Sequence, residues 1–101
     1  MVVSKLNYLA KKMYLLNNIE LVTDNLSKYY GDAAVIESRN VGKTRCIRMG
    51  FKEMLDDGEI NDIESLVSKA ISSSLGFDED FPVYSLFNIS HIDSCTLLVE
   101  V

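Results

Sequence analysis

The sequence predicts an α+β domain in which two helices, a β-hairpin, a third helix and a second β-hairpin follow one another (αα-ββ-α-ββ). Three observations predict it. Apolar residues recur every three or four positions in 6–29 and 61–75, they alternate with polar ones in 44–51, and turn-forming residues separate these segments. We expect an antiparallel sheet with the helices on one face. The length of 101 residues suits one domain, 1–101.

Two apolar stripes predict the N-terminal helices. The first stripe is Leu6, Leu9, Ala10, Met13 and Leu16, and the second is Ile19, Val22, Leu26 and Tyr29. Lys11 and Lys12 fall off the first stripe and should face water. The pair Asn17-Asn18 separates the helices, with Asn18 as the cap of the second and Gly31 just beyond its end. One long helix bent at the Asn pair is the alternative.

A β-hairpin is predicted next, with strands at 33–38 and 44–51 around a loop at 39–43 that contains Asn40 and Gly42. Alternation places Ile47, Met49 and Phe51 toward the core, with Cys46 and Arg48 on the opposite face. Arg45 shares the core side, but it lies near the loop, where its guanidinium can reach water.

The third helix is predicted to open at Asn61, which with Glu64 resembles a capping box, and to end at Gly76. Its apolar face is Ile63, Leu66, Val67, Ala70, Ile71 and Leu75. An acidic turn, 56–59, should precede it. A strand over 83–89, a turn over 90–94 and a strand over 95–101 complete the second hairpin.

The net charge of −5 is unevenly divided along the chain. Residues 1–50 hold eight basic and four acidic residues, whereas residues 51–101 hold two basic and eleven acidic ones. Such asymmetry marks candidate binding surfaces. An alternative is that the bases of the first hairpin form ion pairs with carboxylates of the acidic half in the same chain.

The acidic half predicts a surface for a basic protein partner. Carboxylates around apolar anchors suit such a contact, because the charges steer the encounter and the anchors add affinity. The predicted partner-binding residues are Leu55, Asp56, Asp57, Glu59, Asp78, Glu79, Asp80 and Phe81. The function expected is that of a small acidic inhibitor that occludes a nuclease, toxin or defence complex. Ordinary core packing of Phe77 and Phe81 is the competing interpretation.

The basic hairpin predicts an alternative function, nucleic-acid binding through Arg39, Lys43, Arg45 and Arg48. The negative net charge and the lack of aromatic residues between these bases make this less favoured.

Catalytic chemistry has little support in the sequence, so we expect neither an enzyme nor a bound metal or cofactor. Gly42-Lys43-Thr44 matches the end of a phosphate-binding loop, but Glu37 stands where that loop needs its first glycine. His91, Asp93 and Cys95 are metal-ligand types at alternate positions, and the chain has no other histidine to complete a site.

The chain has two cysteines, no recognisable signal peptide and no apolar run long enough to span a membrane. We therefore expect a reduced, cytoplasmic protein, with a homodimer through edge strands or apolar faces as a further alternative. In size and acidity the chain is similar to toxin-immunity proteins and to phage-encoded inhibitors of bacterial defence, groups that share no sequence motif.

Overall fold

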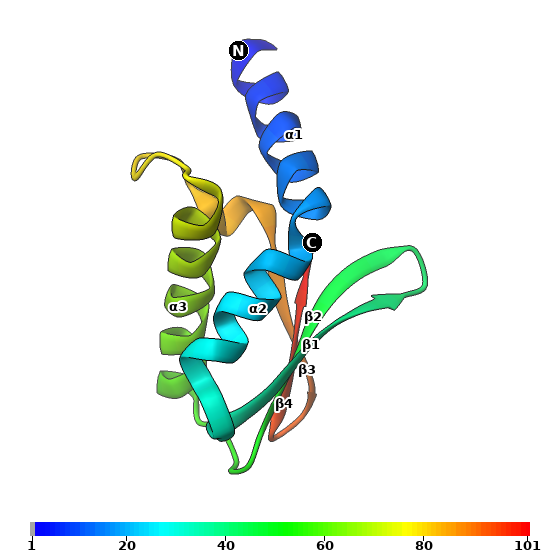
Figure 1. The fold of residues 1–101 in the computed structure, drawn as a ribbon, viewed down its shortest axis with the longest axis vertical. Coiled ribbons are helices and arrows are strands. Elements are labelled where there is room, and N and C mark those ends of the chain that lie inside the picture. The colour runs from blue at the N-terminus through cyan, green and yellow to red at the C-terminus, as the bar shows by residue number, and fades with distance from the viewer. Residues whose placement is uncertain (1) are drawn as a thin grey trace.

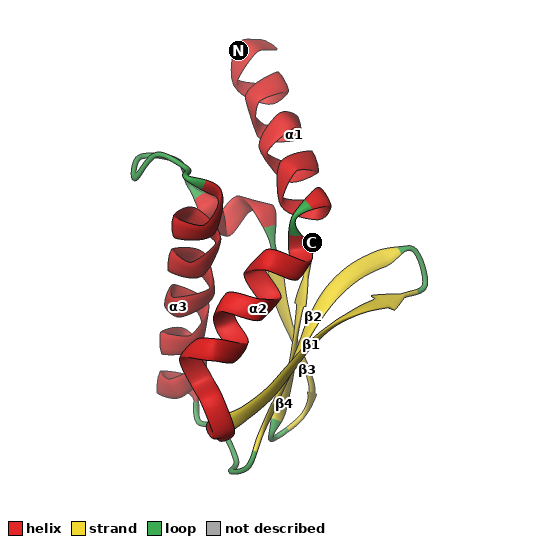
Figure 2. Ribbon diagram, in the orientation of Figure 1, coloured by secondary structure: helices red, strands yellow, loops and turns green. Residues whose placement is uncertain are grey.

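The computed structural model describes the backbone of residues 2–101 and the side chains of residues 7–101. The chain forms α1 (Val2–Asn17), α2 (Ile19–Tyr30), β1 (Ala34–Val41), β2 (Thr44–Phe51), α3 (Asp57–Leu75), β3 (Asn88–Asp93) and β4 (Thr96–Glu100). Short 3-10 turns, Gly31–Ala33 and Val83–Leu86, precede β1 and β3. The predicted αα-ββ-α-ββ order is confirmed, and Figures 1 and 2 show α2 and α3 together on one side of the sheet.

All strand pairs in the sheet are antiparallel, and the strand order is β1-β2-β4-β3. Ile36, Met49 and Leu97 lie side by side across three strands, and Ile47 pairs with Val99. These residues are buried and pack with Leu26 of α2 and Val67 of α3 in one core. The predicted inward face of β2 is therefore confirmed for Ile47 and Met49, while Phe51 is partly buried at the edge of the core.

The first two helices are separate, as predicted, and α1 points away from the rest of the molecule (Figure 1). The prediction for Asn18 is only half right. It occupies the N-cap position of α2 without a side-chain cap, and its Nδ2 instead donates to the Tyr14 carbonyl of α1. Asn18 therefore closes the end of α1, where unpaired carbonyl groups need donors.

The predicted inward face of α1 is wrong. Leu9 and Met13 are 47% and 57% exposed, whereas Leu15 is fully buried, and the side chain of Leu6 lies outside the described residues. Tyr8 packs against the core and donates its hydroxyl to the Ser85 carbonyl. The body of the protein lies beside a different face of α1, which the periodicity alone does not identify.

The first hairpin is longer than predicted, because β1 continues to Val41 and leaves only Gly42 and Lys43 as the turn. Gly42 has a φ of +62°, a conformation that side chains with a Cβ disfavour. In Figure 1 this end of the hairpin curves away from the remaining strands.

Helix α3 begins at Asp57 rather than at Asn61, so the predicted start is wrong. Asp56 is the N-cap, and its carboxylate accepts from the Glu59 N–H at 2.7 Å while the Glu59 carboxylate accepts from the Asp56 N–H. The acidic turn predicted before the helix is therefore the capping box and first turn of the helix. The end at Gly76, with a φ of +67°, is confirmed.

The second hairpin also differs from the prediction. Residues 83–86 form a 3-10 turn, and β3 starts only at Asn88 and runs through the predicted turn to Asp93. Val83 and Leu86 are both buried, a spacing of three that suits a tight helical turn better than a strand.

Candidate functional site

The two predicted acidic clusters lie at opposite ends of α3. Asp56, Asp57 and Glu59 stand at its start, and Asp78, Glu79 and Asp80 follow its end. A helix of 19 residues is about 28 Å long at 1.5 Å per residue, so the clusters form two separate surfaces.

The first cluster has a structural role within the chain. Asp56 and Glu59 hydrogen-bond to each other's backbone, and their charges lie where the helix dipole favours anions. Leu55, predicted as an apolar anchor, is partly buried and packs against the core, while its neighbour Met54 is 72% exposed.

The second cluster, the acidic loop 78–80, lies in the loop drawn in yellow beyond the end of α3 (Figure 1). All three carboxylate residues are exposed, and no ion pair involves them among the side chains of residues 7–101. The Phe81 N–H donates to the Asp78 carbonyl at 3.1 Å, which closes the loop into a turn. The loop therefore presents three unneutralised carboxylates to the solvent.

A cleft of about 570 Å³ adjoins this acidic loop. One wall is the C-terminal half of α3, and the other is the segment 77–84. Its lining is Ser65, Ser68, Lys69, Ser72, Ser73, Phe77, Glu79, Phe81, Val83 and Tyr84. The cleft thus combines an aromatic wall, a stripe of serine hydroxyls and one carboxylate of the acidic loop.

The aromatic wall is built from Phe77, Phe81 and Tyr84. The Phe77 and Phe81 rings meet edge to face with their centroids 5.7 Å apart, and both are partly buried against the core. Tyr84 is 54% exposed. Phe81, the predicted anchor, is therefore partly core and partly cleft wall.

Lys11 of α1 lies over this aromatic pair, contrary to the prediction that it faces water. Its Nζ is 5.7 Å from the centroid of Phe77 and 5.0 Å from that of Phe81, and it donates to Asn7 Oδ1. These are cation–π distances, so the ammonium is attracted to the ring faces. The helical spacing of α1 gives no indication of this contact, because the two rings lie far along the chain.

The serine stripe of the cleft was not among the predicted residues. Ser65, Ser68 and Ser72 recur at spacings of three and four, which places them on one face of α3. That spacing was visible in the sequence. Tyr84 was missed because its segment was assigned to a strand.

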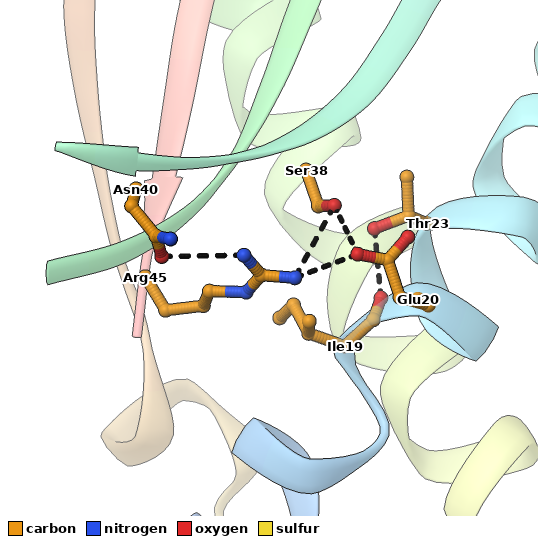
Figure 3. Close-up of polar contacts among 6 residues, drawn as sticks. All are labelled: Ile19, Glu20, Thr23, Ser38, Asn40 and Arg45. Atoms are coloured by element: carbon orange, nitrogen blue, oxygen red, sulfur yellow. Dashed lines mark hydrogen bonds and ion pairs between the residues drawn. The ribbon is translucent and has the colours of Figure 1, made fainter.

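The basic hairpin does not form one surface. Arg45 reaches from β2 to Glu20 of α2, with Nη2 to Oε1 at 2.6 Å, and contacts Asn40 and Ser38 beside it (Figure 3). In the same group Ser38 donates to Glu20, and Thr23 donates to the Ile19 carbonyl. Arg45 therefore ties the hairpin to α2 on the helix side of the sheet.

Arg39 and Arg48 lie on the opposite face of the sheet, where both contact Glu37. Arg39 Nη2 is 2.8 Å from Glu37 Oε1, and Arg48 Nη1 is 3.9 Å from the same oxygen. Lys43 is exposed in the turn. The carboxylates that these three arginines contact, Glu20 and Glu37, belong to the N-terminal half, and Arg39 and Arg48 share Glu37. Within the described side chains, no ion pair joins the basic hairpin to the acidic half.

The segment around His91 has no metal-binding geometry. A bulge between His91 and Asp93 breaks the alternation that would align their side chains. The Asp93 carboxylate accepts from the Cys95 N–H at 2.8 Å, which with the Thr96 hydroxyl holds the pKa of Asp93 below its ordinary value. No group of three or more metal-ligating side chains occurs among residues 7–101.

Both cysteines are free thiols. Cys46 is buried on the sheet face opposite the helices, where burial and then the nearby Glu100 carboxylate raise the pKa of its thiol. Cys95 is partly exposed at the turn before β4.

No helix in residues 2–101 has the length and hydropathy needed to cross a membrane. Comparison of the chain with protein-family models, with curated proteins and with solved structures found no match.

Proposed function

We propose that this protein acts by binding a protein partner through the acidic loop 78–80 and the cleft beside it, and thereby occludes a basic surface. The observation that carries the proposal is an exposed loop of three carboxylates outside any ion pair of the described side chains, one residue of which, Glu79, lines a partly aromatic cleft. Charges steer the encounter, and desolvated aromatic groups supply affinity. Nucleases, toxins and nucleic-acid-binding defence complexes have basic surfaces of this kind.

The other end of α3 supports the proposal less. Asp56 and Glu59 hydrogen-bond to each other's backbone, and the side chain of Leu55 packs partly against the core. We therefore assign partner contact to the acidic loop and treat the start of α3 as a structural element. Free thiols at Cys46 and Cys95 suit a reducing compartment such as the cytoplasm.

The experiment compares two variants that remove three negative charges from opposite ends of α3. The test variant is Asp78→Asn, Glu79→Gln and Asp80→Asn, and the control is Glu53→Gln, Asp57→Asn and Asp62→Asn, which leaves the Asp56–Glu59 box intact. Immobilised proteins are exposed to extract of the cells that naturally produce the protein, and the captured partner is identified by mass spectrometry.

The association rate of the purified partner is then measured across a salt series. We expect the test variant to associate about tenfold more slowly at low salt and to lose most of the salt dependence, because exposed charges act mainly on the encounter rate. The control should behave like the unmodified protein. Equal association by both variants would exclude the acidic loop as the contact surface.

A further inference from the structure

The C-terminal end of α3 gives the cleft a negative electrostatic character. Carbonyl groups in the last turn of a helix carry partial negative charge, which basic side chains commonly offset. The last turn of α3 contains no basic residue, and the acidic loop follows directly. The Gly76 and Phe77 N–H groups both donate to the Ser72 carbonyl, and they leave other carbonyls of this turn to solvent or ligand.

The aromatic wall of the cleft already binds a cation from the same chain. Lys11 Nζ lies within 6 Å of the Phe77 and Phe81 centroids, but Lys11 does not line the cleft. The two rings therefore hold the ammonium while other parts of their surface, with Tyr84, face the cleft. A second cation on the cleft side would gain the same kind of attraction, reduced by repulsion from the Lys11 ammonium.

The serine stripe adds hydrogen-bonding groups to the opposite wall. Ser68 is only 7% exposed, and its Oγ has no hydrogen-bond partner among the described side chains. A buried hydroxyl without a partner is costly, but the Ser68 Oγ is covered, so the serines of the stripe that remain accessible to a ligand are Ser65 and Ser72. Ser65 and Ser72 stand on the same helix face, and the Glu79 carboxylate completes the rim.

We propose that the cleft receives an arginine side chain of the basic partner, an assignment that rests on the proposed function. A guanidinium is planar, weakly hydrated and carries five N–H donors, so it can stack on aromatic rings while it donates to carboxylate and hydroxyl oxygens. The ammonium of a lysine is more strongly hydrated and does not stack. Arginine therefore uses both walls of the cleft at once.

Lys69 provides a second test, because among the residues that the structure describes it is the only cation in the cleft lining. Its ammonium opposes an incoming guanidinium, whereas Glu79 attracts it. Removal of each charge should therefore move arginine affinity in opposite directions.

The experiment titrates isotope-labelled protein with a capped Gly-Ser-Gly-Arg-Gly-Ser-Gly peptide and follows amide shifts by NMR. Peptides with lysine or citrulline in place of arginine are measured in parallel. We expect shifts confined to residues 65–84, weakening of about threefold for Glu79→Gln, and tightening of about twofold for Lys69→Gln. Phe81→Leu should weaken binding by about threefold or more, because it removes an aromatic ring from the wall. If Phe81→Leu does not fold, Tyr84→Ser, at a solvent-exposed position, is measured in its place with the same expectation.

Glu53→Gln is the control, since it removes the same charge at the far end of α3 and should leave the affinity unchanged. Equal binding of the citrulline peptide, equal binding of the lysine peptide, or shifts of similar size around 53–62 would overturn the assignment.

Failure of this inference is distinguishable from failure of the proposed function. Ser72→Phe fills the cleft without a change of charge and should reduce capture of the natural partner by at least tenfold. If Ser72→Phe captures the partner normally while the triple variant Asp78→Asn, Glu79→Gln, Asp80→Asn does not, the arginine site is wrong and the proposed function stands. If that triple variant also captures the partner normally, the proposed function itself is wrong.

Discussion

The carboxylate of Asp56 satisfies a backbone N–H that would have no partner at the start of α3. The Glu59 N–H is one of the first four in the helix, which no preceding carbonyl can reach. Asn61 and Glu64 also combine an N-cap former with a glutamate three residues later, and yet they lie within the helix. The sequence offers two capping boxes, and helix length decides between them, because starting at Asp57 adds a turn that packs Ile60 against the core.

We predict that Asp56→Ala lowers the free energy of unfolding by about 1 kcal/mol, the usual effect of losing an N-cap. Asn61→Ala should be neutral or slightly stabilising, since alanine is the better helix former inside a helix. Urea unfolding followed by circular dichroism measures both, and the reverse ranking would place the start of the helix at Asn61.

At the scale of elements, local patterns predict the existence and order of helices and strands, and tertiary contacts set their limits. The inward faces of β2 and α3 were predictable, because each has one apolar side. The second hairpin was predicted, but the start of its first strand was wrong, because Val83–Leu86 has apolar residues at both parities and a spacing of three. The acidic loop was found from composition, while the cleft requires two segments that only the fold brings together.

Helix α1 illustrates the same limit. Its apolar residues surround most of the helix, so periodicity cannot choose between the face with Leu9 and Met13 and the face with Tyr8 and Leu15. The body of the protein covers the second face and leaves the first to solvent.

We predict that Leu15→Ala destabilises the protein by about 2–4 kcal/mol, because it leaves a cavity in the core. Leu9→Ala should change the free energy of unfolding by less than about 0.5 kcal/mol at an exposed site. Chemical denaturation of both variants provides the measurement, and sedimentation equilibrium provides the control. A large effect of Leu9→Ala accompanied by loss of a dimer would show that this face is an interface between two copies.

At the scale of the whole molecule, the hairpin and the acidic loop carry charge on different surfaces. The arginines of the hairpin contact carboxylates on two faces of the sheet, whereas the acidic loop stays unneutralised at the far end of α3. The net charge of −5 is therefore displayed mainly by the acidic half. This distribution is the reason that we propose a basic protein partner rather than a nucleic acid.

We predict that the protein does not shift a labelled single- or double-stranded oligonucleotide at low salt, because each hairpin arginine contacts a carboxylate, with Arg39 and Arg48 sharing Glu37, and the net charge of the protein repels phosphate. Glu20→Gln combined with Glu37→Gln frees these arginines and should produce weak, salt-sensitive binding. Gel mobility and fluorescence anisotropy both report the result. Binding by the unmodified protein that disappears in Arg39→Ala, Arg48→Ala would support the nucleic-acid alternative.

The strand order has a consequence for how the protein is made. β4 is the last strand in chain order, but it lies between β2 and β3, so neither neighbour can complete its pairing before residue 100 has left the ribosome. Before β4 is available, β1–β2 is the only strand pair of this sheet that can form, and its inner face then lacks Leu97 and Val99. The sheet is therefore completed only by insertion of β4, which forms two ladders at once and joins contacts that are distant in the sequence.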